Sequence, residues 1–445
     1  MNNTRSFAVG MGIALLCGPT NAQPEPQPRP PYLVIEAPAE AAGRFGARVC
    51  LGQGLLLVVG LWNNTTGFVE AYLYNPLTGE PIGTLTTPAI GDAQFVPAAD
   101  LAGNTAIISD DPSVVGAVYQ FDVSDPASPV LVHTLTPPPG NDQSAFGGAI
   151  ALGEGTAFVS DAYYPQPNNA YGAVFVYDTA TGQQIDRLDP PPGSIPVDRF
   201  GSQVKVQGNI VVVCDYDNAV YLFSAATRSY ISTITKPSSS SGFGADVAIV
   251  GDNLFVGADP GRTVYQYKIS DPGSPVAQGL FIPKLDGQQR SGFGFSLNAI
   301  GESLVVGAPS AAVDGVNTGS AFVFDLPVIS QRHRLATDVP VAEGFMGSSV
   351  DVYADTIAVG EASMTAPTAP GRVLLFHPGS GPGCRADMNA DGVVDTIDLH
   401  LLIDNFAFTS QASILKAWCD QNGDGLCTPA DFSAWVANFN HGCDF

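Results

Sequence analysis

The 445-residue sequence has few charged side chains, and most of them are acidic. Asp, Glu, Lys and Arg make up 13% of the chain, about half of the usual share. The 42 acidic residues outnumber the 18 basic ones, which gives a net charge of −24. Nucleic acids and anionic lipid surfaces are bound through Lys and Arg. The sequence therefore argues against both kinds of partner and leaves cations and neutral or basic partners open.

Long apolar segments are also scarce. The run from Phe7 to Leu16 is about ten residues long, too short to span a bilayer. It follows Arg5 and precedes small residues that end at Ala22, which is the layout of a secretory signal peptide. We expect residues 1–22 to be this signal peptide, the alternative being a buried N-terminal strand. The mature chain is then secreted, extracellular or associated with the cell surface, and has no transmembrane segment.

Familiar catalytic motifs are missing from the sequence. The five histidines show neither the His-x-His nor the His-Glu-x-x-His spacing of zinc sites. A Gly-x-Ser-x-Gly nucleophile elbow and a P-loop are absent too. Carboxylate pairs for glycoside hydrolysis can be assembled from distant parts of a chain. The sequence therefore leaves enzymatic activity uncertain and favours a protein without it.

Cysteine is sparse in most of the chain and concentrated at its end. Cys50 and Cys214 lie far apart, and we expect both to be unpaired core residues. Four cysteines crowd into the last part of the chain: Cys384, Cys419, Cys427 and Cys443. In a small exported segment these suggest two disulfides, for which three pairings exist.

Glycine and proline, in contrast, are abundant. The chain has 49 Gly and 36 Pro, and 45% of its residues are hydrophobic, too many for a disordered protein. Such a composition predicts a mainly β body with many short strands and turns.

The sequence repeats itself about every fifty residues. Each repeat starts with Phe-Gly or a near match and continues with an alternating strand, a Gly-containing turn, an apolar strand, and two further strands of which the last runs into proline. Four antiparallel strands in a unit of this length are typical of a β-propeller blade. We therefore predict a seven-bladed propeller over residues 31–378. The repeats start at Phe45, Phe95, Phe146, Phe200, Phe243, Phe293 and Met346.

The seventh repeat lacks a fourth strand. Its third strand, Val373–Phe376, is followed by Pro378 and a Gly-rich linker. Residues 32–38 have the pattern of the missing strand and precede the first Phe-Gly. Pairing the first and last segments removes the exposed edges of an open array, so we predict that residues 32–38 complete blade seven.

These repeats resemble the FG-GAP family. The resemblance implies the propeller fold but no single activity, because propellers host binding, adhesion and catalysis alike. Some FG-GAP proteins bind calcium through an acidic loop between the second and third strands. The corresponding loops here lack a full Asp-x-Asp-x-Asp-Gly spacing, and we expect their carboxylates to be solvated. These carboxylates belong to Asp110, Asp111, Asp161, Asp215 and Asp217.

After the linker at 379–383, two segments align with an offset of 33 residues. Each places oxygen-bearing side chains at loop positions 1, 3, 5, 9 and 12 with Gly at position 6, the spacing that wraps Ca²⁺ together with the main-chain carbonyl of position 7. We therefore expect two calcium ions. The predicted ligands are Asp387, Asn389, Asp391, Val393, Asp395 and Asp398 in loop one, and Asp420, Asn422, Asp424, Leu426, Thr428 and Asp431 in loop two.

Each loop leads into a predicted helix whose apolar residues recur at i, i+3, i+4 and i+7. These are Leu399, Leu402, Ile403 and Phe406, and then Phe432, Trp435, Val436 and Phe439. The two loop and helix halves resemble a type I dockerin in its cysteine-containing form, so we expect an α-helical, EF-hand-like module over residues 384–445.

The resemblance to dockerins implies calcium-dependent docking to a cohesin-like or other surface protein. Positions 10 and 11 of the loops hold Thr396 and Ile397, then Pro429 and Ala430. They lack the hydroxyl pair that is common in cellulosomal dockerins, which argues against a cellulosome-type cohesin. For this module we favour the disulfides Cys384–Cys443 and Cys419–Cys427.

Two functions follow as hypotheses. The first is an exported, non-catalytic binding, adhesion or surface-scaffold protein, whose propeller presents a face to a protein or polysaccharide ligand. The alternative is a secreted polysaccharide-acting enzyme, a glycoside hydrolase or lyase, with its site at the propeller centre and the dockerin as its anchor. An enzyme requires at least two carboxylates that converge at one mouth of the central channel, whereas a binding protein does not.

Overall fold

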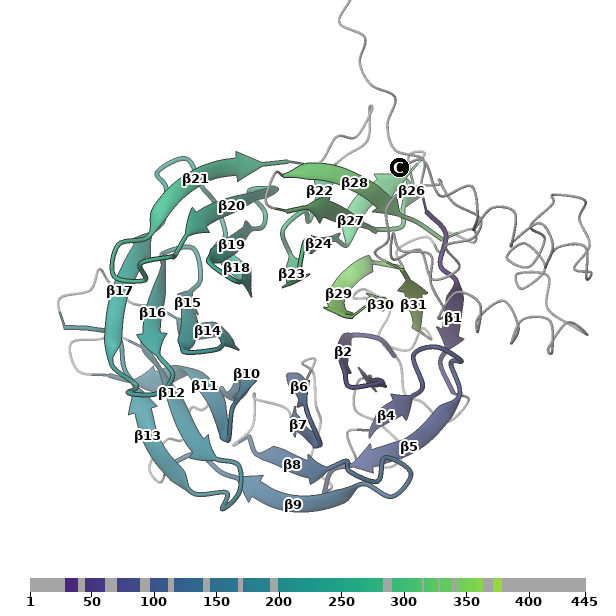
Figure 1. Cartoon of the computed structure of the whole chain (residues 1–445), viewed down its shortest axis with the longest axis horizontal. Helices are drawn as coiled ribbons and strands as arrows, with labels where there is room; N and C mark the ends of the chain where they lie inside the picture. Colours follow the sequence, from purple (N-terminus) through teal and green to yellow (C-terminus); the bar gives the residue numbers. More distant parts are fainter. Residues whose placement is uncertain are drawn as a thin grey trace, which may run out of the picture.

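The computed structural model describes most of the chain between residues 29 and 377 (Figure 1). The predicted leader, linker and C-terminal module lie outside the described residues. Within those residues, no helix is long and apolar enough to cross a membrane. The described ranges are 29–38, 45–60, 70–88, 97–110, 116–138, 145–166, 171–192, 199–282, 290–313, 316–326, 329–337, 341, 344–354, 356–362 and 371–377.

Seven four-stranded antiparallel sheets stand around a central axis (Figure 1), which confirms the predicted seven-bladed β-propeller. From the inner to the outer strand, blades one to three are β2 (Arg48–Gly52), β3 (Leu55–Val59), β4 (Glu70–Tyr74) and β5 (Pro81–Thr86); β6 (Ala99–Ala102), β7 (Thr105–Ser109), β8 (Val118–Asp122) and β9 (Val130–Leu135); and β10 (Phe146–Gly153), β11 (Thr156–Pro165), β12 (Tyr171–Asp178) and β13 (Gln184–Leu188).

Blades four to seven are built in the same way. They are β14 (Phe200–Gln207), β15 (Ile210–Asp215), β16 (Ala219–Ser224) and β17 (Tyr230–Thr235); β18 (Phe243–Val250), β19 (Asn253–Ala258), β20 (Thr263–Lys268) and β21 (Val276–Phe281); β23 (Ser296–Ile300), β24 (Ser303–Ala308), β27 (Ser320–Asp325) and β28 (Ser330–Leu335); and β29 (Met346–Tyr353), β30 (Thr356–Glu361), β31 (Arg372–Phe376) and β1 (Leu33–Glu36). A small extra sheet joins β22 (Arg290–Ser291), β25 (Ser310–Val313) and β26 (Val316–Asn317).

The seventh blade combines both ends of the propeller. Its outer strand β1 pairs antiparallel with β31, with Leu33 opposite Leu375. Beside this pair the ring of Tyr32 stacks on His377, with 4.2 Å between the ring centroids. The Tyr32 hydroxyl also donates a hydrogen bond of 2.7 Å to the carbonyl of Pro76 in blade one. The ring is therefore closed by strand pairing and packing around β1.

The first described residue extends this closure to blade six. The Arg29 N–H donates to the Arg334 carbonyl at 2.8 Å, and the Ala336 N–H donates to the Arg29 carbonyl at 3.0 Å. These bonds form a parallel bridge between Arg29 and Leu335 at the end of β28. The N-terminal segment thus contacts the outer strand of blade six before it becomes the outer strand of blade seven.

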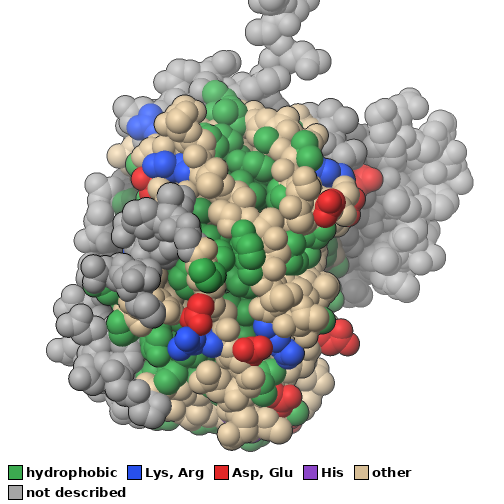
Figure 2. All heavy atoms as spheres, turned by 90° about the vertical axis from the view of Figure 1, so that its left-hand side faces the viewer, with side chains coloured by type: hydrophobic (Ala, Val, Ile, Leu, Met, Phe, Trp, Pro, Cys, Tyr) green, Lys and Arg blue, Asp and Glu red, His purple; other side chains and the backbone are tan. Residues whose placement is uncertain are grey.

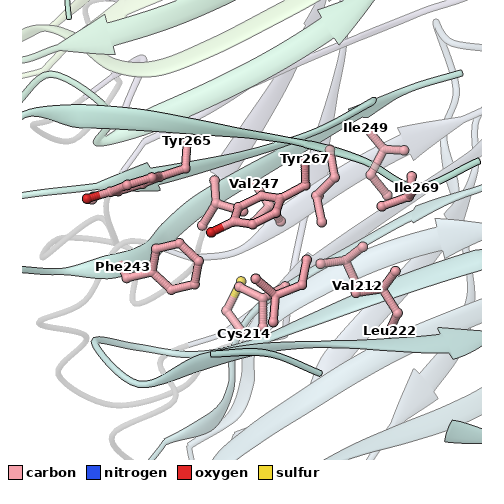
Figure 3. Packing of buried hydrophobic residues seen from close by; sticks show 14 residues of the cluster. Val212, Cys214, Leu222, Phe243, Val247, Ile249, Tyr265, Tyr267 and Ile269 are labelled. Atoms are coloured by element: carbon pink, nitrogen blue, oxygen red, sulfur yellow. The ribbon is translucent and has the colours of Figure 1, made fainter. Parts of the chain in front are cut away.

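The repeated Phe is a packing residue. In blade five, Phe243 is fully buried and meets two aromatic rings of β20, with centroid distances of 5.5 Å to Tyr265 and 6.4 Å to Tyr267 (Figure 3). Edge-on contacts of this kind stabilise aromatic pairs. The same cluster includes Cys214 and Leu222 of blade four, so this core lies between two adjacent blades. The other buried repeat residues are Phe45, Phe146, Phe200, Phe293 and Met346, whereas Phe95 lies outside the described residues.

The repeated Gly is required by backbone geometry. Gly347 has a φ of +89°, and a Cβ placed on it would lie 2.4 Å from the carbonyl oxygen of Ser320 in blade six. A side chain would thus meet both a disfavoured backbone conformation and a clash with the preceding blade. The dipeptide recurs because one residue fills the blade core and the next lets two blades approach closely.

Three of the loop carboxylates expected to be solvated are instead buried. Asp110, Asp161 and Asp215 have exposed fractions of 2%, 0% and 0%. Asp161 accepts a hydrogen bond from the N–H of Ala145 at 3.0 Å, directly before the Phe-Gly that starts the same repeat. Buried backbone donors need a partner, and these acids at the ends of second strands supply one. Asp217 is 40% exposed and pairs with Lys236 at 3.1 Å; Asp111 lies outside the described residues.

Candidate functional site

The inner strands of the blades surround the propeller axis (Figure 1), and charged and polar side chains on six of these strands interact with one another. The group contains three acids, two bases and one amide, from six different blades. They lie close enough to interact electrostatically or through hydrogen bonds. We call them the axial network: Arg48, Asp100, Lys205, Asp246, Asn298 and Asp351.

The three acids of the axial network are held in the same way. Each accepts one hydrogen bond from the N–H of the following residue and another from the inner strand of the next blade. The second bond joins Asp100 to Leu152 N–H at 2.7 Å and Asp246 to Leu297 N–H at 2.8 Å. The acids therefore bind the free edge of the neighbouring inner strand and fasten successive blades together.

Asp351 has an additional partner. Its Oδ2 accepts a 2.6 Å hydrogen bond from the Leu51 N–H of blade one, and its Oδ1 accepts from Val352 N–H at 2.8 Å and from the side-chain amide of Asn298 in blade six. Burial raises the pKa of Asp351 to about 7, against the opposing effects of the Leu51 N–H and Lys205. One carboxyl group thus connects three blades at the place where the ring closes.

Within the described part of the chain, neither of the two bases is in a direct ion pair. No described carboxylate oxygen lies within 4.0 Å of a charged nitrogen of Lys205 or Arg48, and the Arg48 Nε is buried without a hydrogen-bond partner. Burial acts to lower the pKa of Lys205, but the nearby carboxylates, chiefly Asp246, raise it overall. Lys205 is therefore a charged group that interacts with all three acids of the network.

A hollow of about 490 Å³ opens beside the network. It is lined by the hairpin turns that follow the inner strands of blades two, three and four, including Gly103, Glu154 and Gly208. Leu152 and Val206 also line it. Leu152 donates a hydrogen bond to Asp100, and Val206 follows Lys205 in the chain, so the hollow lies next to the network. The hollow is large enough for a small ligand and offers one carboxylate.

Converging carboxylates alone do not make this an active site. A general acid or base must reach the substrate, whereas both oxygens of each axial acid already accept backbone hydrogen bonds. Across the residues that the structure describes, no three His, Cys, Asp or Glu side chains form a metal-binding group. The arrangement is suited to holding blades together.

The sequence did not single out the axial network. Its members lie three or five residues after the Phe or Met that starts each repeat, at positions where other repeats carry Ala, Ser, Cys or Gln. A search for charged residues at these two positions finds all of them except Asn298. The predicted calcium ligands and the four C-terminal cysteines lie outside the described residues. Cys50 and Cys214 are buried free thiols, which confirms the prediction for both.

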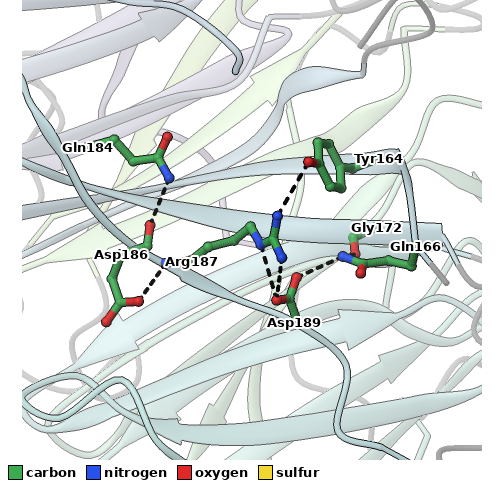
Figure 4. A network of polar contacts seen from close by, with 7 residues as sticks. All are labelled: Tyr164, Gln166, Gly172, Gln184, Asp186, Arg187 and Asp189. Atoms are coloured by element: carbon green, nitrogen blue, oxygen red, sulfur yellow. Dashed lines mark hydrogen bonds and ion pairs between the residues drawn. The ribbon is translucent and has the colours of Figure 1, made fainter. Parts of the chain in front are cut away.

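A second polar cluster lies near the surface of blade three (Figure 4). Arg187 contacts Asp189 at 2.8 Å, lies over the ring of Tyr164 at 5.3 Å, and donates to the Tyr164 hydroxyl at 3.3 Å. Asp189 also accepts from the side-chain amide of Gln166 at 2.7 Å. The cluster links the long β11 and β12 hairpin to β13, which is a structural role.

The outer rim presents apolar side chains among few charges, as Figure 2 shows for the side of the molecule at the left of Figure 1. On the outer strands β17 and β21, Tyr230, Val276 and Leu280 are 44%, 56% and 57% exposed. These side chains give the outer strands β17 and β21 an exposed apolar surface.

The comparisons with known proteins concern the C-terminal part of the chain. Residues 385–439 match the dockerin type I domain, and no curated protein matches the chain. Type I dockerins bind calcium and dockerins bind cohesins, so calcium and a cohesin partner are supported in general. Proteins with dockerins are typically extracellular or on the cell surface. The chain therefore contains a seven-bladed β-propeller followed by a dockerin type I domain.

Proposed function

We propose that this protein is an exported, non-catalytic binding or scaffold protein. Its dockerin domain docks to a cohesin-like receptor in a calcium-dependent manner, and its propeller presents an interaction face. The dockerin match over residues 385–439 is the observation that carries this proposal. The exposed apolar rim around Tyr230, Val276 and Leu280 supports a propeller that binds a protein or a polymer.

The blades belong, in this proposal, to the FG-GAP group of propellers. Burial of the repeated Phe and the positive φ of the following Gly support the relationship, because both features explain why the dipeptide recurs. A signal peptide over residues 1–22 and export of the mature chain are part of the same proposal.

Two calcium ions occupy the dockerin, one in each loop. The ligands of loop one are Asp387, Asn389, Asp391, Val393, Asp395 and Asp398, and those of loop two are Asp420, Asn422, Asp424, Leu426, Thr428 and Asp431. Loop one binds calcium more tightly, because it offers four carboxylates and loop two offers three. The disulfides Cys384–Cys443 and Cys419–Cys427 complete the domain.

The experiment is a binding titration of the full mature chain against a panel of cohesins, with calcium or with EDTA. Binding in calcium and loss of binding in EDTA are expected. The variants Asp387→Ala and Asp420→Ala should weaken binding, whereas Asp404→Ala, an acid outside both loops, should not. Equal binding with and without calcium would contradict the proposal, as would failure to bind any cohesin in the panel.

The alternative is a polysaccharide-acting enzyme with its site at the propeller centre. It draws on the convergence of Asp100, Asp246 and Asp351, whose oxygens would have to leave their backbone hydrogen bonds to reach a substrate. Incubation of the chain with a panel of neutral and acidic polysaccharides, followed by measurement of reducing ends and of unsaturated sugars, tests it. We expect no product. Product formed by the native chain and lost in Asp100→Asn and Asp246→Asn would establish the enzyme.

A further inference from the structure

We infer that the extended hairpin of blade three, together with Arg199 and Tyr216 of blade four, forms a binding site for a polysaccharide without net charge. The inference deepens the proposed function, on which its setting in an exported binding protein rests. The hairpin is long because β11 continues for four residues after the buried Asp161, whereas β15 of blade four ends at the equivalent Asp215. Both acids lie opposite the repeated Phe of their blade.

The exposed aromatic side chains of this extension are two tyrosines. Tyr163 and Tyr171 are 53% and 43% exposed. Tyr171 lies opposite Pro165 in the pair of β11 and β12, and Pro165 is two residues from Tyr163. Neither ring stacks on another residue within the part of the chain that the structure describes. Two aromatic side chains at the end of one hairpin are therefore available to a ligand.

The hairpin that carries these tyrosines is held in place by the polar cluster of blade three (Figure 4). The ring of Tyr164 packs edge-on against Phe175, with 5.2 Å between the centroids, and Arg187 of β13 lies over the same tyrosine at 5.3 Å. The Tyr163 N–H donates to the buried Asp161 carboxylate at 3.2 Å. A ligand therefore meets a backbone that is already ordered, which lowers the entropic cost of binding.

Blade four places an arginine next to the hairpin. Gly172 and Phe200 touch through their backbones, since a Cβ on Gly172 would lie 2.0 Å from the Phe200 carbonyl oxygen. Tyr171 and Arg199 are the preceding residues of this touching pair. The Arg199 guanidinium lies over the ring of Tyr216 at 4.8 Å, and no carboxylate oxygen of the described residues lies within 4.0 Å of it. Arg199 thus has a fixed position and no acidic partner there.

These groups fit a sugar better than a protein. The C–H groups of a pyranose ring carry partial positive charge and pack on the negative face of an aromatic ring, and its hydroxyl groups accept hydrogen bonds from a guanidinium. A protein partner would match exposed aliphatic side chains such as Val276 and Leu280 of β21, and the described part of the extension has none. The net charge of −24 repels polyanions, which favours a polysaccharide without net charge.

The experiment is affinity electrophoresis of the full mature chain in native gels that contain hydroxyethyl cellulose, arabinoxylan or glucomannan, with polygalacturonate as the acidic comparison. At least one of the three neutral polymers should retard the native chain, and polygalacturonate should not. Tyr163→Ala, Tyr171→Ala and Arg199→Ala should each raise the Kd about tenfold. Tyr163→Phe keeps the ring and should bind like the native chain. Tyr353→Ala is the matched control, because Tyr353 of blade seven is 40% exposed, and it should leave binding unchanged.

Three results would overturn the site. The first is unchanged migration of the native chain in all three neutral gels, which would leave the tyrosines to a protein partner. The second is retardation by polygalacturonate alone, and the third is equal retardation of the native chain and the double variant Tyr163→Ala/Tyr171→Ala. Far-UV circular dichroism checks each variant, and Tyr163→Thr or Tyr171→Thr, which keeps a β-branched residue in the strand, replaces any alanine variant that does not fold.

Cohesin binding of the same samples in calcium separates this site from the proposed function. All the tyrosine variants should bind cohesin like the native chain. Intact cohesin binding without polysaccharide binding would contradict the site alone, whereas polysaccharide binding without cohesin binding would contradict only the docking role.

Discussion

Leu33 and Leu375 lie opposite each other in the antiparallel pair of β1 and β31, so that residues from the two ends of the propeller share one blade. The neighbouring Ile35 is only 5% exposed and packs with Phe45 and Tyr72 of blade one. This short strand therefore joins the last blade to the first, and its side chains should contribute to the stability of the whole ring.

Truncation of the closing strand should be costly. Ile35→Ala should lower the free energy of unfolding by about 2 to 4 kcal/mol, because a buried aliphatic side chain is lost. Val130→Ala on the outer strand β9, at a residue that is 57% exposed, should change it by less than about 0.5 kcal/mol. Urea denaturation followed by far-UV circular dichroism measures both values. Equal small effects would mean that β1 adds little to the ring.

The repeated Gly should tolerate no side chain. Gly347→Ala combines a positive φ with a contact of 2.4 Å to the Ser320 carbonyl, and we expect a loss of about 2 to 4 kcal/mol. Gly251 also has a positive φ, of +54°, but nothing lies within 4 Å of its added Cβ. Gly251→Ala should therefore lose only about 1 kcal/mol, and thermal unfolding should separate the two variants. Similar melting temperatures would show that the close approach of blades is not what requires Gly.

Two ion pairs of the propeller should differ in strength because they differ in burial. Arg372 and Glu361 are 11% and 2% exposed, so Arg372→Gln leaves a buried carboxylate without its partner and should cost about 3 to 5 kcal/mol. Adding Glu361→Gln should recover part of the loss. Arg187 and Asp189 are both 38% exposed, and Arg187→Gln should cost about 1 kcal/mol or less. Chemical denaturation at pH 7 provides the comparison, and equal losses would contradict it.

The two thiols of the propeller should be unreactive in the folded protein. Burial, together with nearby carboxylates, raises the pKa of Cys50 and of Cys214, and the thiolate is the reactive form. Titration of the mature chain with a thiol reagent at pH 8 should label neither residue before unfolding. Both should react after denaturation without reductant. Additional reactive thiols in that denatured sample would contradict the two proposed C-terminal disulfides.

The number of blades could be predicted from the sequence because each blade is local. In six of the seven blades all four strands follow one another along the chain. The Phe-Gly pair meets the same two requirements where it recurs: a buried ring against the third strand, as for Phe243 and Tyr265, and a close approach of backbones, as at the Gly of Met346-Gly347. Periodicity in the sequence reports such repeated local demands directly.

The roles of the acids could not be predicted in this way. Asp161 was expected to be solvated, but it is buried and accepts from the Ala145 N–H, which directly precedes a different strand of the blade, β10. Asp351 and Leu51 are 300 residues apart, and only closure of the ring brings them together. The sequence by itself determined the repeated blade and the dockerin domain, whose spacing patterns are short-range. The tertiary structure decided which carboxylates are buried and which of them converge at the axis, because burial and convergence depend on neighbours from other blades.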